Sequence, residues 1–257
     1  MRKVLLIVGS FVVVTVVPQT VSHAQNLETG KPHANALQHK EAVLPTVDYD
    51  KAESTDAHQR ARRNARGKRH DGSLRVGEPH PEAGAKGILD SWMQKVQALP
   101  TVISDAIIIG EISDAQAYLS PDKTGIYSEY TARVEQVVKQ YAKAPISVNG
   151  VVDSQREGGR VRFPSGRVQS YITHYQGVPV VGRRYVLFLK RNKDSETFSL
   201  ITGYELRDGR IYPLDGVNLP PGATELAQFA AYEGVDETSF FKDVEAALSQ
   251  PELAPNM

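Results

Sequence analysis

The segment "AIIIGEISDAQAYLSPDKTGIYSEYTARVEQVVKQY", residues 106–141, decides the fold class because its polar and apolar residues alternate. A period of two residues is typical of β-strands that have one buried face. The expected strands are 106–119 and 126–141, with the turn-forming sequence "SPDKTG" between them. Gly110 predicts a bulge or a close backbone approach. The second strand is expected to bury Tyr130, Ala132, Val134 and Val138, and to expose Glu129, Thr131, Arg133 and Glu135.

Further strands follow at a spacing of about ten residues, each bounded by glycine or proline. Residues 183–190, "RRYVLFLK", are apolar at consecutive positions, which is typical of a strand covered on both faces. The others are expected at 146–152, in a hairpin over 158–175, and in a hairpin that joins 197–206 to 210–216. Short, regularly spaced strands favour a small barrel or sandwich over an α/β fold. We therefore predict a mainly β fold with a small antiparallel β-barrel at its centre.

Helices are expected before and after these strands. Residues 87–99, "GILDSWMQKVQAL", have apolar side chains at helical spacing and begin the predicted barrel domain, residues 86–216. Residues 223–234 and 236–250 show the same spacing. These C-terminal helices, within residues 217–250, are expected to pack on the barrel.

The chain begins with a targeting segment, in which Arg2 and Lys3 precede an apolar run over residues 4–17. This run has about 14 residues, fewer than the roughly 20 that cross a bilayer as a helix. Small residues before Gln25 provide a cleavage site, so we interpret residues 1–24 as a signal peptide. Export to the periplasm or the extracellular space is therefore expected. An uncleaved leader that anchors the chain is the alternative.

Residues 25–85 are predicted to be a disordered basic linker, because they are polar and have no hydrophobic period. We call its cluster of basic residues the basic arm: Arg60, Arg62, Arg63, Arg66, Lys68 and Arg69. Outside the cytoplasm, such a cluster favours anionic envelope polymers or phospholipid head groups. A solvated linker without a partner is the alternative. Contact with a membrane is expected only through this arm or an uncleaved leader.

The composition excludes several kinds of chemistry. The chain has no cysteine, which rules out disulfides, thiolate metal sites and cysteine nucleophiles. Most of its seven histidines lie at or before residue 80 and are too dispersed for metal ligands. We therefore expect neither a metal nor another cofactor.

No catalytic motif stands out. The patterns of serine and zinc hydrolases, phosphate loops, dinucleotide sites and calcium loops are absent. A Ser165–His174 pair across the predicted hairpin is one catalytic alternative, and ordinary hydrogen bonding by both side chains is the other interpretation. Paired carboxylates could also cleave glycosides, with Glu129, Glu135, Asp153 and Glu157 as candidates. Acids on strands and sheet edges are commonly solvated, so we expect no catalytic residue.

Arginine and tyrosine are concentrated in the predicted hairpin and at the start of the next strand. The candidate ligand-binding residues are Arg160, Arg162, Arg167, Tyr171, Tyr175 and Arg183. Guanidinium groups beside tyrosine rings suit sugars or anions, through forked hydrogen bonds and ring stacking. The alternative is that these arginines pair with Glu129, Glu135, Glu157 or Glu205.

The segments "GGRVRFPSGR", "VGRRYVLFL" and "TGYELRDGRIYPLD", together with the first two strands, resemble a family of exported bacterial proteins of uncharacterised function. The resemblance covers residues 106–216 and extends toward 248. It implies a barrel like that of oligonucleotide/oligosaccharide-binding (OB) domains, in the version shared by netrin-like and tissue-metalloprotease-inhibitor domains. Those inhibitors chelate their target's zinc through an N-terminal cysteine, which this chain lacks. Protease inhibition is therefore not implied.

These observations predict an exported, non-catalytic binding module of the bacterial cell envelope. The expected partner is an envelope protein, a glycan or another anionic polymer, and we do not expect nucleic acid. A structural envelope component tethered by the basic arm is the alternative, and a hydrolase is a minor one.

Overall fold

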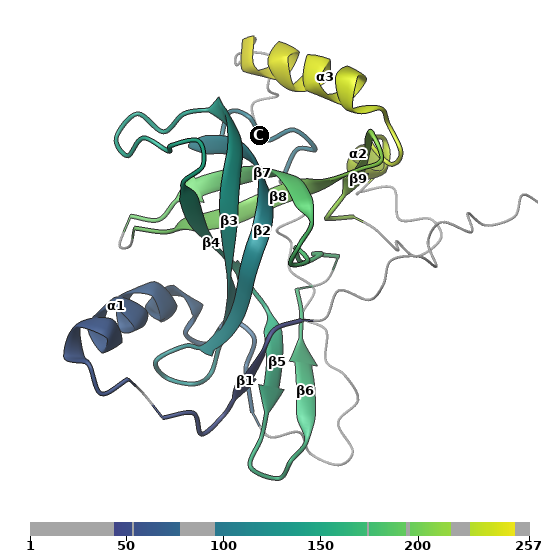
Figure 1. Cartoon of the computed structure of the whole chain (residues 1–257). Helices are drawn as coiled ribbons and strands as arrows, with labels where there is room; N and C mark the ends of the chain where they lie inside the picture. Colours follow the sequence, from purple (N-terminus) through teal and green to yellow (C-terminus); the bar gives the residue numbers. More distant parts are fainter. Residues whose placement is uncertain are drawn as a thin grey trace, which may run out of the picture. The chain divides into compact units, whose positions relative to one another are not determined.

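The computed structural model describes residues 44–52, 54–77, 96–173, 175–193, 196–216 and 227–249. All of them belong to one compact unit, residues 39–257. The predicted signal peptide lies outside the described residues. The described part is mainly β, as predicted from the alternating pattern (Figure 1).

A six-stranded sheet forms the centre of the fold, in the order β4-β3-β2-β7-β8-β9. Its strands are β2 (Ala106–Leu119), β3 (Ile126–Lys139), β4 (Val151–Glu157), β7 (Arg184–Arg191), β8 (Phe198–Arg207) and β9 (Arg210–Pro213). An additional pairing between β4 and β8 closes this sheet into a ring. The closing pair is parallel, although antiparallel pairing was predicted throughout. The reason is strand direction: β4 and β8 are each separated from β2 by two antiparallel steps, so they point the same way.

The arginine-containing hairpin is separate from the ring, which corrects its predicted place in the barrel. Strands β5 (Gly159–Arg162) and β6 (Val168–Tyr171) form a three-stranded sheet with β1 (Thr46–Asp48), in the order β1-β5-β6. The ring has no free edge next to β4, because β3 and β8 pair with its two sides. The hairpin must therefore find another partner, and β1 pairs with β5 in parallel.

The prediction of a disordered linker is wrong for residues 44–52 and 54–77. Besides β1, this region contains helix α1 (Ala57–Gly67) and the short 3₁₀ helix η2 (Lys68–His70). Helix α1 begins after Asp56, whose carboxylate accepts hydrogen bonds from the first free backbone N–H groups. Val47, Leu74 and Val76 are buried in a small core with residues of β2, β3 and β5. These three anchors order a segment whose average composition is polar.

Two larger apolar clusters lie on opposite sides of the sheet. The ring interior contains Ile112, Tyr130 and Leu187 among others. The other cluster covers the outer side of β7 and β8 and includes Phe229 from α2 (Ala227–Ala230) and Phe240 from α3 (Glu237–Ser249). Strand β7 is buried on both faces, as predicted. The predicted C-terminal helix at 236–250 is confirmed, whereas the described part of 223–234 contains a single helical turn.

Local deviations from the predicted strands have clear backbone causes. The pairing of β2 and β3 shifts between Ile109 and Gly110, which inserts an extra residue into β3. Beyond this bulge the alternation reverses, so Val137 joins the interior cluster and Val138 packs against the outer one, contrary to prediction. Gly110 is the close approach that was predicted: a Cβ there would lie 2.4 Å from the Arg133 carbonyl oxygen.

Two other predicted elements differ from the structure. The strand expected at 146–152 begins only at Val151, because Ser147 accepts a backbone hydrogen bond from Gly150 in a tight turn. Asn149 takes the left-handed conformation (φ 64°) that asparagine tolerates in such turns. Most of the helix expected at 87–99 lies outside the described residues, and 96–99 are not helical.

One buried ion pair connects separate parts of the ring. Arg156 on β4 donates two hydrogen bonds to Asp215, at 2.9 and 2.6 Å, and both side chains are almost fully buried. Arg156 also donates to the carbonyl oxygens of Gly177 and Ile201. The pair thus joins β4, the segment before β7, β8 and the end of the β9 hairpin.

Candidate functional site

The outer side of β2, β3 and β4 is polar, and its side chains form three rows across the strands. The register places Asp114 opposite Thr131, which is opposite Asp153. The second row is Gln116, Glu129 and Gln155, and the third is Tyr118, Tyr127 and Glu157. We call these nine residues the polar sheet face. Their neighbours along the strands, such as Tyr130 and Ala132, point into the ring.

A further bulge determines which side chains of β2 lie on this face. The register shifts between Ile112 and Asp114, so that Ser113 is the extra residue. Ile112 remains in the ring interior, and the outward positions after the bulge are Asp114, Gln116 and Tyr118. The alternation predicted Glu129 and Thr131 on the outside of β3, and both lie there. Asp153 and Glu157 on β4 were considered only as catalytic candidates, and the members of the face on β2 were not identified, because placing them beside Glu129 and Thr131 requires knowledge of the strand register.

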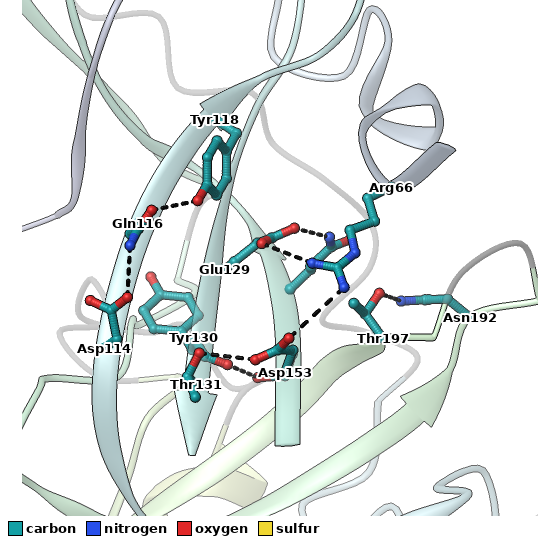
Figure 2. A network of polar contacts seen from close by, with 12 residues as sticks. Arg66, Asp114, Gln116, Tyr118, Glu129, Tyr130, Thr131, Asp153, Asn192 and Thr197 are labelled. Atoms are coloured by element: carbon teal, nitrogen blue, oxygen red, sulfur yellow. Dashed lines mark hydrogen bonds and ion pairs between the residues drawn. The ribbon is translucent and has the colours of Figure 1, made fainter. Parts of the chain in front are cut away.

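Helix α1 lies on this face, and Arg66 makes the central contact (Figure 2). Its guanidinium is 3.3 Å from Glu129 and 3.9 Å from Asp153, so it bridges acids on two strands. Both acids have further partners: Gln155 donates to Glu129 at 2.6 Å, and Thr131 donates to Asp153 at 2.9 Å. The two carboxylates are therefore held in place when the arginine contacts them.

Arg63 occupies the next position toward the β2–β3 turn. Its guanidinium carbon lies 3.7 Å from the centre of the Tyr118 ring, within the range of a cation–π contact. The Tyr118 hydroxyl donates to Gln116, whose amide donates to Asp114. Figure 2 shows this chain of polar side chains along β2. Burial raises the pKa of Tyr118 above its ordinary value, and Arg63 opposes part of that shift.

The segment after α1 covers the third row. The His70 ring stacks on Tyr127 with centroids 4.5 Å apart, and its Nδ1 is 3.6 Å from a Glu157 carboxylate oxygen. Arg69 donates a hydrogen bond to the Gln155 side chain. Gly67 permits the close fit, because a Cβ there would lie 3.3 Å from the Tyr127 ring. The basic arm therefore contacts all three rows of the face through its successive arginines and His70.

The charges of helix and face are complementary. The polar sheet face has four acids and no basic residue, whereas α1 has four arginines and no acid. The helix has weak intrinsic stability: it is short, and Arg62 and Arg66 repel each other at a spacing of four residues. Its exposed alanines, Ala57, Ala61 and Ala65, make no apolar core with the sheet. The contacts of Arg66 with two acids and of Arg63 with the Tyr118 ring are therefore the ones that connect α1 to the face.

The six candidate ligand-binding residues are not all brought together: four lie on the β5–β6 hairpin and two lie elsewhere. On β5, Arg160 is half-buried and Arg162 pairs with Asp48 at 3.0 Å. Arg167 lies in the turn before β6, and Tyr171 exchanges hydrogen bonds with the Gly77 backbone. The other two lie elsewhere: Tyr175 packs against the outer core and Arg183 pairs with Glu205 at 2.9 Å. For Arg183, the alternative interpretation, in which the arginine pairs with a nearby glutamate, is therefore the correct one.

The rest of the basic arm has mixed roles. Arg60 donates to the carbonyl oxygens of Ser54 and Thr55 at the start of α1. Arg62 and Lys68 are exposed.

The structure also places the catalytic alternatives. Glu129 and Asp153 share Arg66, and Glu135 pairs with Arg184 at 2.8 Å. His174 lies outside the described residues. Within the described ranges, no group of histidine, aspartate and glutamate side chains has the arrangement of a metal site.

Comparison of the chain with protein-family models, curated proteins and solved structures found no significant match. Among the helices in the described part of the chain, none is long and apolar enough to cross a membrane.

Proposed function

We propose that this protein is an exported, non-catalytic binding module of the bacterial cell envelope, and that its polar sheet face binds a protein partner. The observation that carries the proposal is that the face already holds a polypeptide segment. Helix α1 and the η2 turn that follows it are bound through arginines that contact carboxylates, an amide and a tyrosine ring on three neighbouring strands.

The arrangement of the ring supports this choice of surface. We interpret the ring β2-β3-β4-β8-β7 as an OB-like barrel, in which β3 and β4 are the second and third strands. In barrels of that kind, the face of these two strands is used for binding polymers. Here that face has Glu129, Asp153 and Glu157, so it repels anions and selects a cationic polypeptide. The partner is therefore a protein with exposed basic residues.

The same contacts bear on the tether alternative. A basic arm that anchors the protein to anionic polymers needs arginines that are free to contact the polymer. Arg63, Arg66 and Arg69 already contact the sheet, whereas Arg62 and Lys68 are exposed. A polymer bound through the first three would compete with their contacts to the sheet.

Site-specific photo-crosslinking in the native cell tests the proposal. A photoreactive residue at Gln116, which is exposed on the polar sheet face, should give covalent adducts with one defined protein. The matched control is the same residue at Lys242, which is exposed on α3 and away from this face. The adduct should disappear when Glu129→Gln and Asp153→Asn are introduced. Equal adducts at both positions, or none at Gln116, would contradict the proposal.

A further inference from the structure

We propose that α1 is a displaceable occupant of the polar sheet face, and that the partner replacing it is an arginine-rich helical segment of another protein. This inference rests on the proposed function, that the face binds a protein. It adds the chemistry of the partner and a competing segment within the chain itself.

The spacing of the bound arginines defines what the face recognises. Arg63, Arg66 and Arg69 are separated by three residues, a spacing that places side chains on one side of a helix. They meet three different acceptors: an aromatic ring at Tyr118, a pair of carboxylates around Arg66, and the Gln155 amide. The planar, forked donor group of an arginine suits all three better than the compact ammonium group of a lysine. A partner helix with arginines at this spacing can make the same contacts.

The contacts of α1 are of the kind that exchange readily. The side chains of Arg66 and Glu129 are 25% and 14% exposed, and Asp153 is 41% exposed, so water can replace each contact as it breaks. Gly67 is the only buried residue of α1. Release therefore costs little apolar burial, and the helix has no acids to stabilise it away from the face.

The docked helix also leaves a polar group unsatisfied. Tyr127 is fully buried beneath His70 and the end of α1. Its hydroxyl has no hydrogen-bond partner among the described residues. Burying a hydroxyl without a partner is unfavourable. A partner that offers an acceptor at this point would bind the face better than α1 does, which is the differential affinity that displacement requires.

Both ends of the segment are fixed, so α1 can leave without unfolding the rest. Before it, β1 is paired with β5. After it, Leu74 and Val76 are buried, and the Val76 backbone donates to Thr124 at 2.7 Å. The tether keeps α1 close to the face at a high effective concentration, so the apparent affinity of every competing ligand is reduced to the fraction of time that the face is free. A partner with matching arginines has the contacts needed to overcome this competition.

Fluorescence anisotropy with a synthetic peptide provides the test. The probe is a labelled peptide with the sequence of residues 54–70, "STDAHQRARRNARGKRH", added to the purified chain without its leader. In the chain, Arg63→Ala with Arg66→Ala weakens the docked helix. Arg62→Ala with Lys68→Ala removes the same charge from exposed positions and is the matched control. We expect the first variant to bind the peptide at least about tenfold more tightly than the control, with binding that weakens as salt is added.

Two further measurements keep the outcomes distinct. Adding Glu129→Gln and Asp153→Asn to the first variant should abolish the gain, because the acceptors are then neutral. In the unmodified chain, excess peptide should accelerate amide hydrogen exchange in residues 57–67, and this readout applies even if a variant fails to fold. Equal peptide affinity in both arginine variants, or unchanged exchange in α1, overturns the inference. Adducts from Gln116 in the cell would then still support the proposed function.

Discussion

Among the acids of the described residues, Asp215 is the one whose replacement by its amide should destabilise the protein most. Asp215 is fully buried and accepts two hydrogen bonds from Arg156, whose side chain is 2% exposed. It also accepts a backbone hydrogen bond from Gly177 at 3.0 Å. Asparagine has nearly the same shape but is neutral, so the guanidinium would remain buried without a compensating charge.

The size of the effect follows from that uncompensated charge. Removing one partner of a buried ion pair typically costs about 3–5 kcal/mol, because the remaining ion stays desolvated. Total stabilities of single domains are about 5–15 kcal/mol, so the loss is a large fraction. For a domain of this size, each kcal/mol lowers the melting temperature by about 2–4 °C, which predicts a decrease of roughly 6–20 °C.

Thermal unfolding followed by far-ultraviolet circular dichroism, together with urea titration, measures this loss. Asp48→Asn is the matched control, since it breaks the Asp48–Arg162 pair in which both side chains are 57% exposed. Such an exposed pair contributes about 0–1 kcal/mol. If Asp215→Asn lowers the melting temperature no more than Asp48→Asn does, the reasoning about the buried pair is refuted.

Three other predictions concern the strands and turns around the ring. Gly110→Ala should cost about 1–3 kcal/mol, because the new Cβ would lie 2.4 Å from a carbonyl oxygen of β3; Gly77→Ala, with open space around it, should leave the unfolding midpoint unchanged. Hydrogen bonds from Ser120 and Thr124 lower the pKa of Asp122 from 3.8 to about 2, so its contribution to stability is complete above pH 4 and is lost as the pH falls toward 2. A carboxyl NMR titration should place the midpoint near 2, and a midpoint unaffected by Thr124→Val would argue against these bonds. Burial raises the pKa of Tyr130 from 10.0 to about 12, so stability should fall as the pH rises from 10 to 12, and Tyr130→Phe should reduce that fall in alkaline melting curves.

Several elements could be predicted because their signal lies within the element itself. The alternation over 106–141 identified β2 and β3, and the apolar run over 183–190 identified β7 as buried on both faces. The reason is that side chains of a strand point to alternate sides, so a strand with one buried face has apolar and polar residues at alternate positions. Such a signal fails at a bulge. The extra residue in β3 lies between the partners of Ile109 and Gly110, and after it Val138 packs on the outer cluster and not in the ring interior. The alternation of polar and apolar residues did not indicate this change at Val138.

The ordered basic arm was missed because disorder was inferred from average composition. Leu74, Val47 and Val76 are few among many polar residues, yet they are buried together with side chains from β2, β3 and β5. The average composition of the segment cannot identify these three anchor residues, because they become buried only against an apolar surface that distant strands form.

The sequence by itself determined β2 and β3, the burial of β7 on both faces and the outward position of Glu129 and Thr131, because these depend on neighbours two residues away. Only the tertiary structure decided that Glu129 and Asp153 would share Arg66. Charge attraction acts through space and not along the chain, and Arg66 reaches these acids only after ring closure and the burial of Leu74 and Val76 bring the segments together. The sequence therefore lists every residue of the polar sheet face, but only the fold brings these residues together on one surface.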